Sequence, residues 1–332
     1  MPRLRLWLAT AALAISGCGG PFPQSTLHPR SDFARATDAL FTDIFWWAAG
    51  VFVVVELMLL VAIVRFRHRE GRAAPRPTHG HTLMEIGWTL APAVILVFVA
   101  VPTVRTIFAT AGEAPADALK VDVIGHQWWW EFRYQELGLV TANELHVPLG
   151  RVVQLSITSA DVIHSFWAPP LGGKRDAIPG HVTRIAFRPD QVGDYMGQCA
   201  EFCGASHANM RLRVVVDSDS GFGRWATVQL AGPAAPAPGT LAERGKAVYV
   251  STACIGCHTI QGVSPGVIGP NLTHVGARAT IASGLFLNDS AHLASWIADA
   301  PAMKPGSIMT RMKPPLTDAD IAGLVAYMQS LK

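Results

Sequence analysis

Residues 197–210 read Gly-Gln-Cys-Ala-Glu-Phe-Cys-Gly-Ala-Ser-His-Ala-Asn-Met, a run of thiol, imidazole and thioether side chains at short, regular intervals. Cys199 and Cys203 lie four positions apart, His207 follows four later, and Met210 three later still. A loop with this spacing can fold its soft atoms around one small centre, and His164 offers a distant second imidazole. Thiolate and imidazole ligands favour copper, zinc or iron–sulfur chemistry, and copper commonly takes a weak methionine ligand. The spacing therefore favours copper, with a zinc site or a Cys199–Cys203 disulfide as alternatives.

A second cysteine motif lies nearer the C-terminus. Residues 254–258 read Cys-Ile-Gly-Cys-His, the attachment signature of a covalently held haem. In such a motif Cys254 and Cys257 form thioethers to the haem, and His258 binds the iron. A haem that only carries electrons needs a second axial ligand, and methionine in that place raises its potential. The candidates are three methionines: Met303, Met309 and Met312.

Composition indicates a chain that lies partly in lipid. Its 332 residues suggest two or three domains, 50% are hydrophobic and only 15% are charged. The net charge of +3 is too small to indicate a nucleic-acid partner, and we expect none. Much of the basic charge sits in one short loop, at Arg65, Arg67, Arg69, Arg72 and Arg76.

Two apolar stretches predict a transmembrane helical hairpin at residues 40–105. Ile44–Val64 and Leu83–Val104 are each long enough to cross ~30 Å of hydrocarbon as a helix. Because basic loops stay in the cytoplasm, the arginine loop predicts that the N-terminus and everything after residue 105 lie outside. Glu56 and Glu85 fall within the spans, where ionisable groups are functional candidates. The alternative for Glu85 is a carboxylate that reaches out to the interface.

The N-terminus predicts a signal peptide at residues 1–17. Arg3 and Arg5 precede an apolar stretch from Leu6 to Ile15, and small residues follow before Cys18. This arrangement is similar to a bacterial lipoprotein cleavage box, which would leave Cys18 lipidated at the mature N-terminus. The alternative is an ordinary signal peptide with an incidental cysteine.

Two further domains follow the hairpin. Short β-like runs punctuated by Gly, Pro, Asn and Asp occupy residues 115–230 and predict a β-sandwich or barrel. Residues 231–239 form a Pro/Ala-rich linker with no apolar face to bury. Residues 240–332 carry helical patterns at both ends and predict an all-α domain around the haem motif. The β-like runs are Lys120–Ile124, Trp128–Tyr134, Arg151–Thr158, His181–Phe187 and Met210–Val216.

Residues 40–216 resemble subunit II of the haem–copper cytochrome c oxidases. The resemblance rests on five segments: residues 85–92 (Glu-Ile-Gly-Trp-Thr-Leu-Ala-Pro), 125–131 (Gly-His-Gln-Trp-Trp-Trp-Glu), 161–166 (Asp-Val-Ile-His-Ser-Phe), 174–180 (Lys-Arg-Asp-Ala-Ile-Pro-Gly) and 197–210. It implies a multidomain membrane protein with a two-helix hairpin and a cupredoxin domain that carries the binuclear copper centre CuA.

The resemblance also implies a role for each residue of the site. It implies that the thiolates of Cys199 and Cys203 bridge two copper ions, that His164 and His207 bind one each, and that Met210 and the Glu201 carbonyl complete the set. The Glu201 carboxylate would bind a magnesium or manganese ion shared with subunit I.

Two more residues acquire roles from the same resemblance. Trp128 matches the tryptophan through which electrons reach the copper site, although packing within the barrel is an alternative. Glu85 matches the glutamate at the mouth of the K proton channel.

The C-terminal part resembles a class I cytochrome c, fused as in caa3-type oxidases. Met309 ends Lys-Pro-Gly-Ser-Ile-Met and matches the axial methionine, although core packing is an alternative. Pro270, in Gly-Pro-Asn-Leu, matches the residue whose carbonyl orients the proximal histidine.

The two resemblances together imply a function for the whole chain. It would relay electrons from haem c through CuA to subunit I, which reduces oxygen to water with proton pumping. We expect partners in subunits I and III, a soluble or membrane cytochrome c-type donor, and lipid. The location would be a bacterial plasma membrane, with the copper and haem domains on the outer face. The alternative is a stand-alone membrane-anchored electron carrier, or a copper-delivery protein, without an oxidase partner.

Overall fold

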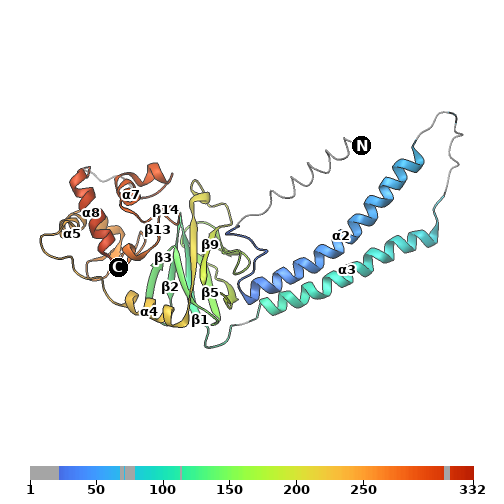
Figure 1. The fold of residues 1–332 in the computed structure, drawn as a ribbon, viewed down its shortest axis with the longest axis horizontal. Helices are drawn as coiled ribbons and strands as arrows, with labels where there is room; N and C mark the ends of the chain where they lie inside the picture. Colours follow the sequence, from blue (N-terminus) through green and yellow to red (C-terminus); the bar gives the residue numbers. More distant parts are fainter. Residues whose placement is uncertain (1–21, 68–70, 72–78, 113, 310–314) are drawn as a thin grey trace, which may run out of the picture.

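The computed structural model describes residues 22–67, 71, 79–112, 114–309 and 315–332. A long helical hairpin projects from one side of a β-sandwich, and a small helical domain packs on the other side (Figure 1). The predicted signal peptide at 1–17, Cys18 and Met312 lie outside the described residues, as do three of the loop arginines, Arg69, Arg72 and Arg76.

The hairpin consists of helices α2 (Asp32–Phe66) and α3 (Thr82–Thr110), which run side by side (Figure 1). Both are long and apolar enough to cross a membrane. In the most apolar stretch of each helix, no residue is buried within the chain. Each predicted span lies inside a longer helix. Pro92 and Pro102 are accommodated within α3, as membrane helices allow.

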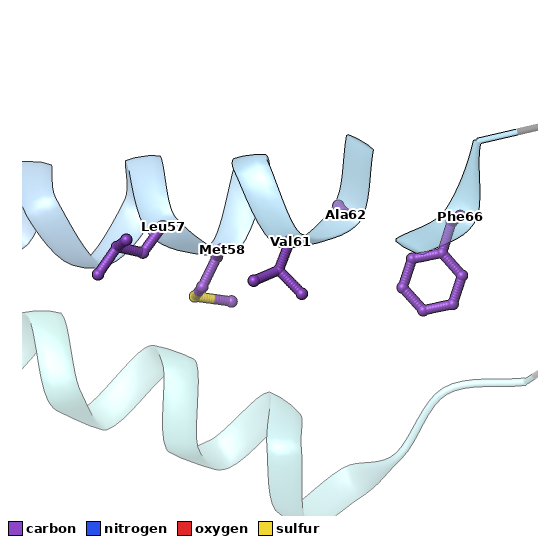
Figure 2. Close-up of a pocket in the computed structure, with 5 residues that line it drawn as sticks. All are labelled: Leu57, Met58, Val61, Ala62 and Phe66. Carbon is purple, nitrogen blue, oxygen red and sulfur yellow. The ribbon is translucent and has the colours of Figure 1, made fainter. Parts of the chain in front are cut away.

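An open apolar hollow lies along the inner side of α2. Leu57, Met58, Val61, Ala62 and Phe66 line it, and the side chains of Met58, Val61 and Phe66 extend toward α3 (Figure 2). All five side chains are apolar, so this surface suits hydrocarbon and offers no group for acid–base chemistry or for metal binding.

The start of α2 is fixed to the sandwich. The Ser31 hydroxyl caps the helix by accepting from Ala34 N at 3.0 Å, and donates to the Leu171 carbonyl at 2.6 Å. The Phe33 ring packs where Gly172 and Gly173 have no side chain. The first turn of α2 is therefore attached directly to the sandwich.

The sandwich contains two five-stranded sheets. Their orders are β3-β2-β1-β5-β8 and β4-β10-β9-β6-β7, antiparallel except that β1 pairs with β5, and β10 with β4, in parallel. Burial alternates along the central strands, as expected where one face of each sheet packs on the other. The strands are β1 (Leu119–His126), β2 (Trp129–Tyr134), β3 (Leu139–Ala142), β4 (Glu144–Pro148), β5 (Val153–Ser159), β6 (His164–Trp167), β7 (Arg175–Ala177), β8 (Thr183–Phe187), β9 (Gly193–Cys199) and β10 (Arg211–Asp217).

Large aromatic side chains fill the space between the two sheets. Trp130 and Phe132 are fully buried and pack edge-on against Phe166. Helix α4 (Asp219–Leu230) closes one end, where Phe222 and Trp225 stack near Tyr134.

The C-terminal domain, which begins at α5, is mainly helical. Its helices are α5 (Leu241–Ser251), α6 (Cys254–Cys257), α7 (Ser290–Met303) and α8 (Asp318–Ser330). Helices α5 and α8 cross where Gly245 meets Gly323. The predicted all-α fold is confirmed in its helices, and two short strand pairs accompany them, β11 (Thr259–Ile260) with β12 (Ser264–Pro265) and β13 (Thr280–Ile281) with β14 (Phe286–Leu287).

Candidate metal centre and haem site

The loop between β9 and β10 brings the predicted copper ligands together. Cys199 is the last residue of β9, and a single 3₁₀ turn at His207–Asn209 folds the loop back so that Met210 meets the start of β10. Strand β6 pairs with β9 through Phe166 and Cys199, and this pairing carries His164 to the same place. Strand pairing thus positions a ligand that lies 35 residues before Cys199 in the chain.

The sulfur and nitrogen atoms of this cluster lie within a few ångströms of one another. Both thiols are free, with their Sγ atoms 3.7 Å apart. Cys203 Sγ lies 3.6 Å from His207 Nδ1 and 3.9 Å from Met210 Sδ. Cys199 Sγ lies 3.2 Å from the Glu201 carbonyl oxygen. Ligand atoms of His164, Cys199 and Cys203 all fall within 4.8 Å of each other, so the donor set fits a metal centre.

His164 is oriented to offer one particular nitrogen. Its Nε2 is 2.8 Å from Asp161 Oδ1, whereas its buried Nδ1 has no hydrogen-bond partner. A buried polar atom without a partner is costly, and a metal ion would satisfy it. The ring packs against Gly125, where a Cβ would come within 2.7 Å of His164 Cδ2. These observations fit a metal bound through Nδ1.

Asp161 is a residue of this site for which we predicted no role. Burial raises the pKa of its carboxyl, but hydrogen bonds from His164 and from the Gln127 backbone N–H outweigh it and lower the pKa overall. The ionised carboxylate therefore holds the His164 ring in place. The only sequence signal that could have suggested this role is the position of Asp161 three residues before His164.

The two thiols influence each other strongly. The hydrogen bond from Cys203 lowers the pKa of Cys199, and that same bond raises the pKa of Cys203. One thiolate therefore forms readily, and a second thiolate beside it requires a cation. This behaviour suits a pair of thiolates that share metal ions.

Trp128 lies directly on the loop that carries Cys199 and Cys203. Its indole Nε1 donates to the Cys203 carbonyl at 3.0 Å, and Gln127 Nε2 donates to the same oxygen at 2.8 Å. Trp128 also belongs to the buried core of the sandwich, so it packs there as well as contacting the loop.

The C-terminal domain presents the haem motif on α6. His258 follows this helix and its Nδ1 lies 2.8 Å from the Pro270 carbonyl, so Nδ1 carries the proton and Nε2 is left for iron. Burial lowers the pKa of His258 and keeps the ring neutral, as a metal ligand must be. A Cβ at Gly269 would come within 2.8 Å of His258 Nδ1, so glycine permits the approach. The residues therefore fit a covalently held haem.

The remaining predicted residues occupy distinct places. Met309 is half-buried and its backbone N–H donates to Ser307 Oγ at 3.3 Å, while Met303 ends α7. Glu85 lies in the first turn of α3, at the end of the hairpin far from the sandwich (Figure 1). The roles of Met309, Glu85 and the Glu201 carboxylate stay predictions.

The C-terminal domain contacts the sandwich through polar groups that no sequence motif singled out. Glu144 Oε1 accepts from Ala279 N at 3.0 Å and from Thr280 N at 3.2 Å. Ser206 Oγ donates to the Pro305 carbonyl at 2.6 Å. Lys304, only 4% exposed, donates to the Trp128 carbonyl at 2.6 Å.

Comparison with known proteins agrees with this arrangement. Cytochrome c oxidase subunit 2 of Alkalihalophilus pseudofirmus is 33% identical over 98% of this chain and 96% of the relative. The chain belongs to the cytochrome c oxidase subunit II family. The protein of the same name from Bacillus subtilis is 33% identical over 99% of this chain and 98% of its own length.

Three family descriptions match successive parts of the chain. The transmembrane domain of cytochrome c oxidase subunit II matches residues 28–106, its periplasmic domain matches 137–219, and cytochrome c matches 242–332. The solved periplasmic domain of subunit II of cytochrome oxidase from Bradyrhizobium japonicum is 32% identical over 35% of this chain and 96% of that one, with a TM-score of 0.34.

Family membership settles the general character of the subunit. It is one chain of an oxidase complex with subunit I, and the two helices anchor it in a membrane. The subunit II domain implies copper and the cytochrome c domain implies haem c. The matches support the predicted oxidase function over a stand-alone carrier or a copper-delivery protein.

Proposed function

We propose that this subunit passes electrons from haem c, held at Cys254, Cys257 and His258, through a binuclear copper centre to subunit I of a caa3-type oxidase. The observation that carries the proposal is the pair of free, buried thiols of Cys199 and Cys203, 3.7 Å apart. Bound there, the two metals would supply a single-electron relay whose shared charge limits the change in geometry on reduction.

The positions around the thiols favour two copper ions. His207 and Met210 lie beside Cys203, the Glu201 carbonyl lies beside Cys199, and His164 is near both thiols. We therefore assign the thiolates as bridges, with one imidazole for each copper. The Glu201 carboxylate, on the same turn, would bind magnesium or manganese together with subunit I.

Trp128 is the proposed point at which electrons reach the copper loop. Its indole contacts the loop through the hydrogen bond to the Cys203 carbonyl.

Met309 is the proposed second axial ligand of the haem. Met309 follows α7 and precedes α8 in the chain, so it belongs to the connection between these two helices.

The basic loop of the hairpin favours a cytoplasmic position for the end that carries Glu85. Glu85 and the arginines at 65 and 67 lie at the end of the hairpin opposite the sandwich. With that end in the cytoplasm, both redox domains lie on the periplasmic face and Glu85 stands at the proton-collecting mouth of the oxidase.

Oxygen reduction and proton pumping then belong to subunit I. Subunit III is an expected further partner, and an external cytochrome c supplies electrons. A lipid on Cys18 would add to the anchorage.

Metal and haem analysis of the complex tests the proposed centres. After correction for the metals of subunit I, we expect two coppers and one covalent haem for each copy of this chain. Cys203→Ser should remove the copper and leave the haem attached, because the two sites lie in separate domains. Zinc in place of copper, or a single copper per chain, would refute the binuclear centre.

Co-purification separates this function from the alternatives. In a mild detergent the subunit should remain associated with an oxygen-reducing subunit I. A chain that purifies alone, with its copper transferable to another protein, would instead be a carrier or a delivery protein.

A further inference from the structure

The structure contains a tight turn of the C-terminal domain that rests on Trp128. Lys304–Ser307, here called the docking turn, closes with a hydrogen bond from Ser307 N to the Lys304 carbonyl at 3.1 Å. Pro305 supplies the fixed φ of the second position, and Gly306 has the positive φ of +81° that a type II turn needs at the third. Lys-Pro-Gly-Ser therefore specifies this turn locally.

The docking turn leaves no space above the indole ring. A Cβ at Gly306 would come within 2.5 Å of Trp128 Cη2 and within 3.5 Å of Ala205 Cβ. The indole also lies against Gly204 of the copper loop, where a Cβ would be 3.2 Å from Trp128 Cζ2. The ring thus contacts both the copper loop and the C-terminal domain, and Trp128 is only 9% exposed.

A buried lysine holds the turn in place. Lys304 Nζ donates across the domain boundary to the Trp128 carbonyl at 2.6 Å, and within its own domain to Ser283 Oγ at 2.9 Å and the Ala282 carbonyl at 3.2 Å. Its three N–H groups therefore have three acceptors. An ammonium group this deeply buried is costly unless every donor is satisfied, and separating the domains would break the bond to Trp128.

Two further contacts surround the same point. Ser206, fully buried, donates to the Pro305 carbonyl at 2.6 Å. Ser283 donates to the Trp128 carbonyl at 2.7 Å and accepts from Arg211 N through its own carbonyl at 3.1 Å. Ala282 and Ser283 both have positive φ, at 55° and 64°, which is a strained conformation for residues with side chains. Both residues lie in the turn that meets the sandwich.

We propose that the docking turn closes Trp128 to any separate cytochrome, so that the copper centre accepts electrons only from the haem of its own chain. This inference rests on the proposed role of Trp128 as the point where electrons reach the copper loop. An external donor must then reduce the haem first. The donor would lose one electron to the haem, and the haem would pass that electron on to the copper centre across the closed contact.

Side-chain footprinting of Trp128 tests the closure without reference to turnover. In the intact complex, hydroxyl-radical oxidation of Trp128 should be slow. Gly306→Leu wedges the turn from the indole and should raise the oxidation of Trp128 several-fold. Lys304→Met, which removes the charged group but keeps much of its length, should do the same. Haem content and the haem absorption spectrum should stay unchanged in both variants, which shows that the C-terminal domain remains folded.

Gly262→Leu is the matched control. Gly262 lies in the same domain and also has a positive φ, of +74°, but a Cβ there meets nothing within 4 Å. Its backbone strain is therefore similar, and Trp128 should stay protected. Equal oxidation of Trp128 in the wild-type chain and in Gly306→Leu would overturn the closure.

Rapid mixing with a reduced soluble cytochrome c tests the consequence. In the wild-type complex, copper should become reduced only after the haem, with a lag. In Gly306→Leu and Lys304→Met, part of the copper should be reduced directly, in a phase without a lag whose rate rises with donor concentration. If Trp128 becomes exposed and no direct phase appears, the turn does not control access and the proposal is wrong. Failure of haem-to-copper transfer in the wild-type chain would instead contradict the proposed function itself.

Discussion

The spacing of the copper ligands reveals only part of the site, because a side chain outside that loop orients one of the ligands. Spacing identified Cys199, Cys203, His207 and Met210, because soft ligands on one short loop must lie close together. It could not identify the Asp161 carboxylate that orients His164, since a spacing of three residues does not by itself show that two side chains meet. Pairing between β6 and β9 had to be known first.

Asp161→Ala should weaken copper binding without removing a ligand. The His164 ring would lose the partner of its Nε2, and loss of such orienting partners costs about 10- to 100-fold in metal affinity. Asp161→Asn retains an oxygen acceptor at the same position and should recover most of the affinity. Competition with a copper chelator measures both variants. Equal copper retention in Asp161→Ala and the wild type would show that His164 needs no support.

Met309→Ala should change the haem without detaching it. Loss of the thioether ligand should abolish the sulfur-to-iron absorption band of the oxidised haem and lower its potential. Met303→Ala should leave both nearly unchanged, because Met303 is the last residue of α7. If the band survives in Met309→Ala and vanishes in Met303→Ala, the axial ligand is Met303 and the proposed assignment is wrong.

Among the elements, those with a strong local pattern were the most predictable. Both membrane spans and the terminal helices of the C-terminal domain follow from hydrophobic runs and helical periodicity. The five predicted strands overlap β1, β2, β5, β8 and β10. Strands β3, β4, β6, β7 and β9 were missed, because each is short or carries Gly and polar residues that weaken the local pattern.

The crossing of α5 and α8 provides a test at this scale. Helix propensity alone predicts that Gly245→Ala stabilises α5 by about 1 kcal/mol. In the structure, however, the new methyl group would overlap the carbonyl of Gly323 in α8. We therefore expect a net loss of about 1–3 kcal/mol from forced repacking.

Urea unfolding of the full chain, followed at the haem absorption band, measures this change. Ala247→Gly, at an exposed position of the same helix, serves as control and should cost about 1 kcal/mol through propensity alone. A higher unfolding midpoint for Gly245→Ala would mean that the two helices do not cross as closely as described.

At the scale of the whole molecule, the order of domains was predictable and their contact was not. Composition shifts separate hairpin, sandwich, linker and haem motif along the sequence. The contact between the sandwich and the C-terminal domain depends on groups such as Glu144, Ser206 and Lys304, which lie far apart in the chain. Nothing local in the sequence pairs these residues, so only the fold reveals that the two redox domains meet at Trp128.

The central claim is that the two domains form one electron relay within a single chain. Rapid reduction with one electron per chain, followed by absorption of haem and copper, tests it most directly. The account predicts that the haem loses its electron as the copper gains it, at a rate independent of protein concentration, and that the haem stays reduced in Cys203→Ser. A wild-type haem that stays reduced beside oxidised copper, or a transfer rate that rises with protein concentration, would contradict it.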